Sequence, residues 1–449
     1  REQNLQSPVR IAKDKSNVSY SWSAENLPAV LSENYSTGLD KYTPEVSLAP
    51  SDFEIGGKKG NAATWESFGM FVAGLIKDRD NLEGPVADTV RKIIAGTSDT
   101  TEMIKRIYKY VQNRTRYVSV QVGIGGWQPI DAQKVDKTKY GDCKGLVNYT
   151  RALLKVAGIK SIYTTVRAGK YEDDIYYDFP SNQSNHIILC VPRSNDTIWL
   201  ECTNQYCPFN YLSSYTDDRH ALLITDKGGK LIKTPRYNAS QNLQLRKANV
   251  TIDLLGNGSA DISTDYNYFF FDNKAYLLYT DQESRKKSII SNIDIPGFTL
   301  VNFSVKQPDK DIPSMNESLS LKLNKYGTVM GDRILIPVNL MNKVDRLPSN
   351  VADRKMGIEL MREMTFTDII TYKIPAGYGV STVPQPVDIS SPFGHYKAEI
   401  TVNGNEITYK REMRYNKGVF PVSQYQQLLD FNKSISTADN AKLVLKKLT

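Results

Sequence analysis

The chain changes its hydrophobic period about halfway along, and this change limits the folds that it can adopt. From residue 62 apolar residues recur at the three- and four-residue spacing of amphipathic helices, as in Trp65, Phe68, Val72 and Leu75. From about residue 245 apolar residues alternate with polar ones, which is the spacing of half-buried strands. The sequence therefore predicts a helix-containing region followed by a β-rich one.

Three regions are predicted from these patterns and from the length of 449 residues. Residues 1–60 mix short strand-like runs with Pro, Ser and Asn, which is typical of the end of an N-terminal β-rich domain. Residues 61–240 combine helices with strands from about 161 to 203 and form a predicted α+β core. A long helix from Cys143 to Ala157 lies in this core.

The alternating pattern of residues 241–449 predicts one or more C-terminal β-rich domains. Alternation on both sides of Gly256-Asn257-Gly258 and of Asn403-Gly404 indicates two hairpins. Helical segments are expected near 273–288 and 422–431. We interpret this half as a β-sandwich-type domain of one or two layers with small helical insertions.

Composition excludes several classes of protein. Lys and Arg total 57 against 49 Asp and Glu, a mild excess that is spread along the chain, so we expect no nucleic-acid partner. The longest apolar run is too short for a transmembrane helix. The four cysteines show neither a disulfide framework nor a zinc-site spacing, although a Cys202–Cys207 bridge stays open. We expect no metal or organic cofactor. A start at Arg1 rather than Met is consistent with removal of a signal peptide or a larger N-terminal piece.

The segment Tyr140-Gly141-Asp142-Cys143-Lys144-Gly145 immediately precedes and enters the long helix. Asp142 is a suitable N-cap, which places Cys143 in the first helical turn. Unpaired N–H groups and the helix dipole favour a thiolate at this position, and the thiolate is the nucleophilic form of cysteine. Cys143 is therefore a candidate nucleophile, and a small buried cysteine is the structural alternative.

A base and an orienting acid are available downstream. His186 precedes the apolar run Ile187-Ile188-Leu189, and only three histidines exist in the chain. If the strand of His186 and the strand ending near Glu201 form a hairpin with a symmetric turn near Ser194, the two residues face one another directly. This arrangement is that of a nucleophile–base–acid triad, while an ordinary cross-strand polar pair is the alternative.

Developing negative charge on a substrate oxygen needs hydrogen-bond donors. The turn Gly125-Gly126-Trp127-Gln128-Pro129 lies upstream of the cysteine and offers an amide side chain and an indole N–H. Gln128 is the first candidate and Trp127 the second, and each fits equally well as a turn or packing residue. The backbone N–H of Cys143 is a further candidate donor.

These segments, together with Asn185-His186 and Trp199-Leu200-Glu201, resemble the transglutaminase-like core of bacterial proteins in the papain-type cysteine protease superfamily, in which a β-rich domain of unknown function flanks the core on each side. The resemblance covers about residues 90–225. It implies that Cys143, His186 and Glu201 are the catalytic residues. The superfamily acid is usually Asp, so Glu201 departs by one methylene. The resemblance also implies export to the bacterial periplasm or cell surface.

The sequence thus predicts a thiol-dependent amide hydrolase or acyl transferase that acts on a protein, peptide or glycopeptide through a thioester. Water as acyl acceptor gives a peptidase or amidase, and a lysine side chain gives a transglutaminase. We favour hydrolysis because it needs no second substrate pocket. The alternative is a non-catalytic scaffold whose β domains bind glycan or protein, with which the 27 tyrosines are compatible.

Overall fold

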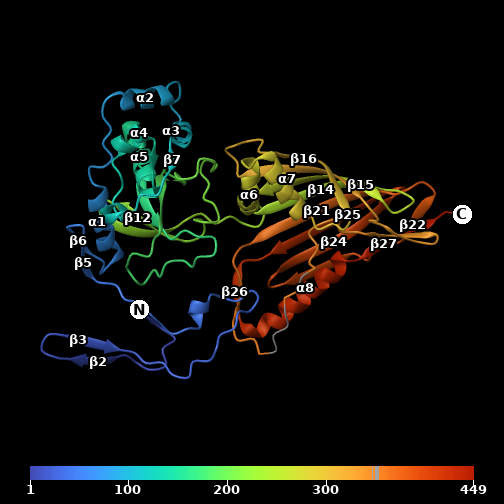
Figure 1. Cartoon of the computed structure of the whole chain (residues 1–449), viewed down its shortest axis with the longest axis horizontal. Coiled ribbons are helices and arrows are strands. Elements are labelled where there is room, and N and C mark those ends of the chain that lie inside the picture. The colour runs from blue at the N-terminus through green and yellow to red at the C-terminus, as the bar shows by residue number, and fades with distance from the viewer. Residues whose placement is uncertain (346, 349–352, 449) are drawn as a thin grey trace. The chain divides into compact units, whose positions relative to one another are not determined.

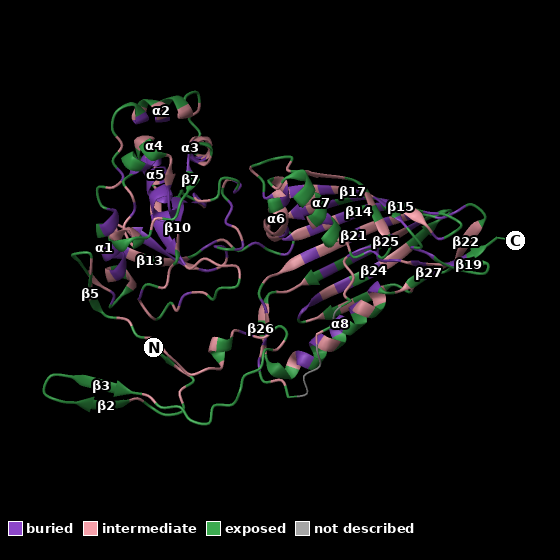
Figure 2. Ribbon diagram, viewed as in Figure 1, coloured by how far each residue is buried: buried purple, intermediate pink, exposed green. Residues whose placement is uncertain are grey.

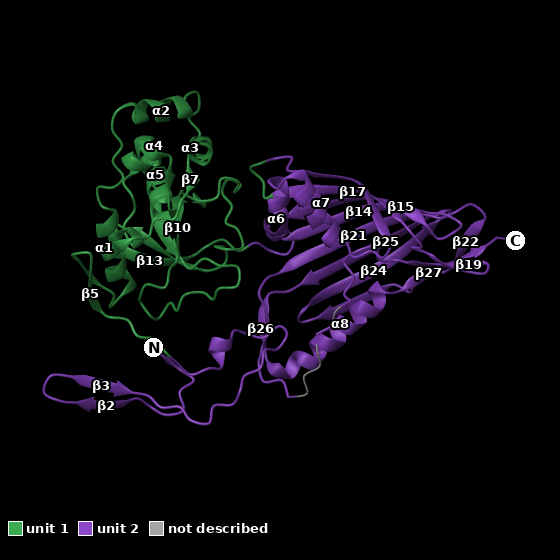
Figure 3. Cartoon of the chain, in the orientation of Figure 1, with its two compact units in different colours: residues 1, 46–236, 310–313 green, residues 2–45, 237–309, 314–449 purple. Residues whose placement is uncertain are grey.

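The computed structural model describes residues 1–345, 347–348 and 353–448, and the chain forms two compact units (Figure 1, Figure 3). Unit 1 contains residues 46–236 together with Arg1 and a short piece at 310–313. Unit 2 contains residues 2–45, 237–309 and the chain from 314 onward. The predicted division into an N-terminal, a core and a C-terminal domain stays a prediction.

Unit 1 is a five-stranded antiparallel sheet with helices, as predicted for an α+β core. The strand order is β11-β10-β9-β12-β13, so β9 lies at the centre and is paired on both sides. The strands are β9 (Ile162–Val166), β10 (His186–Pro192), β11 (Thr197–Leu200), β12 (His220–Thr225) and β13 (Gly228–Lys233). The helices are α1 (Trp65–Ile76), α2 (Pro85–Ile94), α3 (Thr100–Arg114), η2 (Gly123–Gly126), α4 (Ala132–Thr138) and α5 (Cys143–Val156). Two short strand pairs are also present, β5 (Asp52–Ile55) with β6 (Lys58–Asn61) and β7 (Arg116–Tyr117) with β8 (Tyr140–Gly141).

Helix α5 is the central element of unit 1, and Figure 2 shows it as largely buried. Its predicted extent is confirmed, because it begins at Cys143 and the chain leaves it at Ala157 and Gly158, the latter with a φ of +73°. Its apolar side chains pack against the inner residues of β9 and β10 and against α3 and α4. A sheet on one side and helices on the other therefore fix the position of its first turn.

Helix α1 packs on β13 with no room for a side chain between them. A Cβ added to Gly69 would lie 1.9 Å from the backbone nitrogen of Gly229. An adjoining face of the helix presents Phe68, Val72 and Leu75 at positions i, i+4 and i+7. The close backbone approach thus holds this apolar stripe at a fixed distance from the sheet.

Unit 2 confirms the β-rich character predicted for the second half of the chain. Its main sheet has eight strands in the order β16-β17-β15-β14-β21-β25-β24-β23, and only β14 and β21 run parallel. Both predicted hairpins are present, at β14–β15 and at β24–β25. The strands are β14 (Leu243–Ile252), β15 (Gly258–Asn267), β16 (Phe298–Lys306), β17 (Ser314–Leu323), β21 (Met364–Lys373), β23 (Val387–Ser391), β24 (Gly394–Asn403) and β25 (Glu406–Tyr415).

A second sheet of four strands and several helices complete unit 2. The second sheet has the order β18-β19-β27-β22. Its strands are β18 (Thr328–Met330), β19 (Arg333–Pro337), β22 (Tyr378–Thr382) and β27 (Lys442–Lys447), and the helices are α6 (Phe269–Lys274), η3 (Ala275–Leu278), α7 (Gln282–Ser291), η4 (Val422–Gln424) and α8 (Tyr425–Asp439). The remaining short elements are η1 (Leu39–Lys41) and the paired strands β1 (Glu2–Gln3) with β4 (Glu45–Val46), β2 (Arg10–Lys13) with β3 (Val18–Ser21), and β20 (Ile358–Leu360) with β26 (Gly418–Phe420).

A buried charge network joins α8 to the eight-stranded sheet. Arg411 on β25 donates to both carboxylate oxygens of Asp439, at 2.7 and 2.9 Å, and its remaining nitrogen reaches Asp368 at 3.4 Å. The hydroxyl of Tyr396 and the amide of Asn339 also donate to Asp439. Because each nitrogen of the guanidinium and each oxygen of the Asp439 carboxylate has a partner, the two charges are tolerated in the core.

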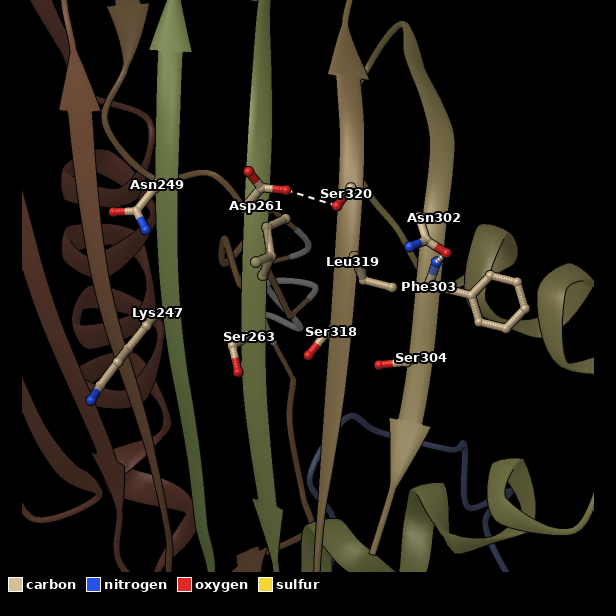
Figure 4. Close-up of a pocket in the computed structure, with 11 residues that line it drawn as sticks. Lys247, Asn249, Asp261, Ser263, Asn302, Phe303, Ser304, Ser318, Leu319 and Ser320 are labelled. Carbon is tan, nitrogen blue, oxygen red and sulfur yellow. Dashed lines mark hydrogen bonds between the residues drawn. The ribbon is translucent and has the colours of Figure 1, made fainter. Parts of the chain in front are cut away.

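The outer face of the same sheet is polar, and a shallow pocket of about 300 Å³ lies on it (Figure 4). Ser320 donates to Asp261 at 2.7 Å across β17 and β15, and Asn316 donates to Ser263 at 2.8 Å. This pocket brings together hydroxyl, amide and carboxylate groups but no cysteine and no histidine. It therefore has no cysteine–histidine pair that could serve as nucleophile and base. Across the described residues, no helix is both long enough and apolar enough to cross a bilayer.

Candidate active site

The first turn of α5 is built around Asp142. One of its carboxylate oxygens accepts a hydrogen bond from the backbone N–H of Gly145 at 2.9 Å, so the predicted N-cap is present. The other oxygen accepts from the ammonium group of Lys144, and both side chains are buried. Cys143 is the first residue of the helix and only 5% of it is exposed. An added Cβ at Gly145 would meet only ordinary contacts, the nearest at 3.5 Å.

The structure brings His186 to Glu201 and to Cys143. The His186 Nε2 nitrogen lies 2.8 Å from Glu201 Oε2. The imidazole also hydrogen-bonds with the side chain of Cys143, and because Nε2 is engaged by the carboxylate, Nδ1 is the nitrogen that remains for the sulfur. The three residues predicted as a triad are thus neighbours in space. Their catalytic roles stay predictions.

Glu201 is held by further hydrogen bonds on its other oxygen. Glu201 Oε1 accepts from the backbone N–H of Thr203 at 2.9 Å and from the hydroxyl of the same residue. The backbone carbonyl of Glu201 accepts from the hydroxyl of Tyr108 at 2.8 Å. Because both carboxylate oxygens are bonded, the side chain is fixed in the orientation that faces His186.

The register of the predicted hairpin is wrong by two residues. The symmetric turn pairs Leu189 with Ile198, whereas the structure pairs Leu189 with Leu200. Glu201 therefore lies just beyond the end of β11 and diagonal to His186. A shift of two residues leaves each side chain on its original face, so the contact survives the error.

Electrostatics favour a charged pair at neutral pH. Burial acts to lower the pKa of His186, but the Glu201 carboxylate and the hydrogen bonds to Cys143 and Glu201 outweigh it and raise this pKa to about 10. Burial acts to raise the pKa of Glu201, but the imidazolium and the hydrogen bonds from Thr203 bring it below its ordinary value. The imidazole is therefore protonated, and the carboxylate ionised, over a wide range around pH 7.

A pocket of about 320 Å³ opens beside the pair and is lined by both Cys143 and His186. One wall is apolar and comes from α1 and Trp127, whose ring packs edge-on to Phe71 at 6.1 Å. The other wall carries uncharged polar groups. The lining residues are Phe68, Val72, Leu75, Gln121, Gly126, Trp127, Cys143, Lys144, Tyr163, Thr165, Asn182, Ser184, Asn185, His186 and Ile187.

The two predicted oxyanion donors have different environments. Trp127 lines the pocket. Gln128 does not, because its side-chain amide donates to the carbonyl of Leu75 at 3.1 Å and so is committed to holding α1. Trp127 thus borders the pocket and Gln128 does not, and the oxyanion roles of both stay predictions.

Sequence reasoning missed several polar residues of the pocket. Gln121 lies in the segment before the Gly-rich turn and exposes its amide to the pocket. Tyr163 and Thr165 come from β9, where their spacing of two places both on the face that α5 covers. The spacing of two is visible in the sequence, but it is equally typical of residues that only pack in a core. None of the four cysteines, all of them in the described residues, forms a disulfide, so no Cys202–Cys207 bridge is present.

Comparison with known families agrees with this arrangement. Residues 87–209 match the transglutaminase-like superfamily, and residues 332–445 match a domain of unknown function with solved structure, DUF3858. The chain therefore contains a transglutaminase-like core followed by a DUF3858 domain.

A solved structure shares the fold. It is the crystal structure of a putative protease from Parabacteroides distasonis ATCC 8503, with a TM-score of 0.53 and 14% sequence identity. The match covers 98% of this chain and 68% of the other. No curated protein matches the chain. At this identity the likeness shows the fold alone.

Proposed function

We propose that this protein is a cysteine hydrolase that cleaves an amide bond of a protein, peptide or glycopeptide. The observation that carries the proposal is the contact of His186 with both Cys143 and Glu201 at the mouth of a pocket. The Cys143 thiolate attacks the carbonyl carbon, the imidazolium of His186 gives its proton to the leaving amine, and a thioester remains. Glu201 fixes the ring and stabilises its charge. Water then hydrolyses the thioester, with His186 as base.

Two groups are available to stabilise the oxyanion in this scheme. Trp127, whose indole N–H can donate, lines the same pocket as Cys143. The backbone N–H of Cys143 lies at the start of α5, where helix N–H groups have no intrahelical partner. Both donors belong to elements that are held by packing.

Charge at the pocket supports water, rather than an amine, as the acceptor. The titratable residues that line it are Cys143, Lys144, Tyr163 and His186, and no carboxylate lines it. The cationic groups of the lining are already paired with Asp142 and Glu201, so a lysine side chain arriving as a cation would find no carboxylate on the lining to pair with, which is unfavourable in a partly enclosed site. Water meets no such penalty.

The lining also restricts the residue that is cleaved. An apolar wall from α1 faces a wall of hydroxyl and amide groups, so an uncharged side chain fits better than a charged one. The putative protease with the same fold supports a polypeptide substrate. Export to the bacterial periplasm or cell surface remains part of the proposal.

The first experiment measures the rate of Cys143 alkylation by iodoacetamide against pH, with peptide mass mapping, in wild type and in His186→Ala. The other cysteines are internal controls, because burial raises the pKa of Cys190 and of Cys202 to about 12. We expect wild-type Cys143 to react fastest at neutral pH and to lose this advantage in the variant.

A second assay distinguishes water from an amine as the acyl acceptor. Peptides with uncharged side chains are incubated with and without a fluorescent primary amine, and new amino termini and amine incorporation are counted. Hydrolysis predicts new termini with little incorporation. Dominant amine incorporation would make the protein a transglutaminase. A Cys143 that alkylates no faster than Cys190 would move the assignment to a binding scaffold.

A further inference from the structure

Tyr163 is a deeply buried tyrosine that lines the pocket of Cys143. In the described residues, four of the five most buried tyrosines donate their hydroxyl to a protein acceptor at 2.6–2.9 Å. The fifth, Tyr163, is only 2% exposed, yet within the described part of the chain its hydroxyl makes no hydrogen bond. The four partnered tyrosines are Tyr108, Tyr149, Tyr372 and Tyr396. The hydroxyl of Tyr163 is not among the described buried polar atoms that lack a partner, which indicates that it is open to the pocket and can bond to a ligand there.

The position of this hydroxyl identifies the ligand group. Tyr163 lies on β9, the central strand of the sheet, which is paired on both sides and cannot easily shift. Its side chain lines the same pocket as Cys143 and is close enough to the charges of Cys143 and Asp142 to feel both. A substrate carbonyl attacked by the sulfur therefore lies in the pocket that Tyr163 lines.

The hydroxyl is suited to be a donor rather than an acid that ionises. Burial, followed by the negative charges of Cys143 and Asp142, raises the pKa of Tyr163 well above its ordinary value. The O–H is consequently retained at every pH at which the site would work. It makes no bond to the sulfur in the free protein, so its bond forms only when a substrate oxygen arrives, which is the condition for stabilising a transition state rather than a ground state.

We propose that the Tyr163 hydroxyl donates a hydrogen bond to the oxyanion formed when Cys143 attacks an acyl carbon, and so acts with Trp127 and the backbone N–H of Cys143. This inference rests on the proposed function. It adds a third donor from a different element, because β9 approaches the sulfur from the sheet while Trp127 approaches it from the Gly-rich turn.

The test compares two reactions of the same sulfur. Iodoacetamide alkylation displaces iodide at a CH₂ group and forms no oxyanion. With p-nitrophenyl acetate, a new S–C bond forms at the carbonyl carbon and an oxyanion appears. The bond between that carbon and the p-nitrophenoxy oxygen then breaks, which releases p-nitrophenolate and leaves a thioester. Both rate constants are measured in wild type, Tyr163→Phe and Tyr149→Phe, with Cys143→Ser giving the background. Tyr149 is the matched control, because it is a buried tyrosine on α5 that bonds to Asp136 and does not line the pocket.

In Tyr163→Phe we expect the acylation rate to fall roughly 10²-fold, the loss typical of one oxyanion donor, while alkylation stays within about twofold of wild type. We expect Tm to be unchanged or higher in this variant and lower in Tyr149→Phe, which loses a real hydrogen bond. Equal losses in both reactions would mean that Tyr163 supports the thiolate or the local fold, and would overturn the proposal. So would an unchanged acylation rate, or a Tm that falls as far as in Tyr149→Phe.

The proposed function fails in a different way. If wild-type Cys143 reacts with neither reagent faster than the other cysteines, the hydrolase proposal falls, and the role of Tyr163 falls with it. If wild type reacts selectively with both reagents but Tyr163→Phe behaves like wild type, only the role of Tyr163 is excluded.

Discussion

Replacing Glu201 with Gln removes one negative charge and little else. The amide keeps an oxygen that can accept from His186 or from Thr203, and the side chain keeps its length. The Glu201 charge is the main influence that raises the pKa of His186 to about 10 against the opposing effect of burial. Without it, burial should bring this pKa to its ordinary value of 6.5 or below.

The size of the effect follows from these two values. At pH 7.5 an imidazole with a pKa of about 10 is almost fully protonated. One with a pKa of 6.5 or below is protonated in roughly a tenth of molecules or fewer. Because the thiolate of Cys143 is stabilised by the imidazolium, its alkylation at pH 7.5 should slow by about tenfold or more in Glu201→Gln.

Two measurements check this expectation. In Glu201→Gln, the part of the Cys143 alkylation rate that depends on the imidazolium should decline above about pH 6.5. Wild type should show no such decline. The chain has only three histidines, so the ring protons of His186 can be assigned by substitution and titrated by NMR. A wild-type His186 that titrates near 6.5 would refute the reasoning, whatever the alkylation rates. Glu201→Asp is the matched control, since it keeps the charge and shortens the reach.

Three further predictions concern stability. Because the folded pKa of His186 is raised, the stabilisation that it gains from Glu201 is fully present below pH 6.5 and is lost as the pH rises toward about 10, so the Tm difference between wild type and Glu201→Gln should shrink over that range. Asp439→Asn removes the negative charge that balances the buried Arg411 guanidinium. The free energy of unfolding, measured by urea titration, should fall by about 3–5 kcal/mol. A loss under about 1 kcal/mol would contradict this expectation. Gly69→Ala should destabilise unit 1 by at least about 1–3 kcal/mol through its clash with the β13 backbone. Gly74→Ala on the same helix meets nothing within 4 Å and should be neutral or slightly stabilising, so similar losses in both variants would show that helix propensity, not packing, is responsible.

Local patterns in the sequence were sufficient to predict many elements of the fold. The N-cap at Asp142, the extent of α5 and the two hairpins of unit 2 depend on residues close together in the chain, and all are present. The parallel pairing of β14 with β21 could not be predicted, because it joins residues about 120 positions apart and leaves no local signature. The same holds for the pairing of Arg411 with Asp439.

The site shows the same division between local and long-range information. Cys143 and His186 were identifiable because a helix start and a scarce histidine are visible in the sequence. The environments of Gln128 and Trp127 could not be identified in this way, because both residues lie in one short turn. The position of α1 decides that the Gln128 amide bonds to Leu75 while Trp127 lines the pocket. Tyr163 was hidden for a further reason, because a buried tyrosine on a strand looks like core until the absence of a partner for its hydroxyl is seen.

The register of β10 and β11 gives a physical reason for Glu rather than Asp at position 201. Residues directly opposite one another in an antiparallel pair have Cβ atoms about 4.5–5.5 Å apart, whereas diagonal neighbours are about 7–8 Å apart. Since Leu189 pairs with Leu200, residue 201 is diagonal to His186, and the longer separation has to be covered by side chain. The extra methylene of Glu201 supplies that reach and delivers Oε2 to 2.8 Å from Nε2, while Oε1 remains available to Thr203. The departure from the usual acid is therefore matched by the strand register, so the glutamate alone is no argument for an inactive site.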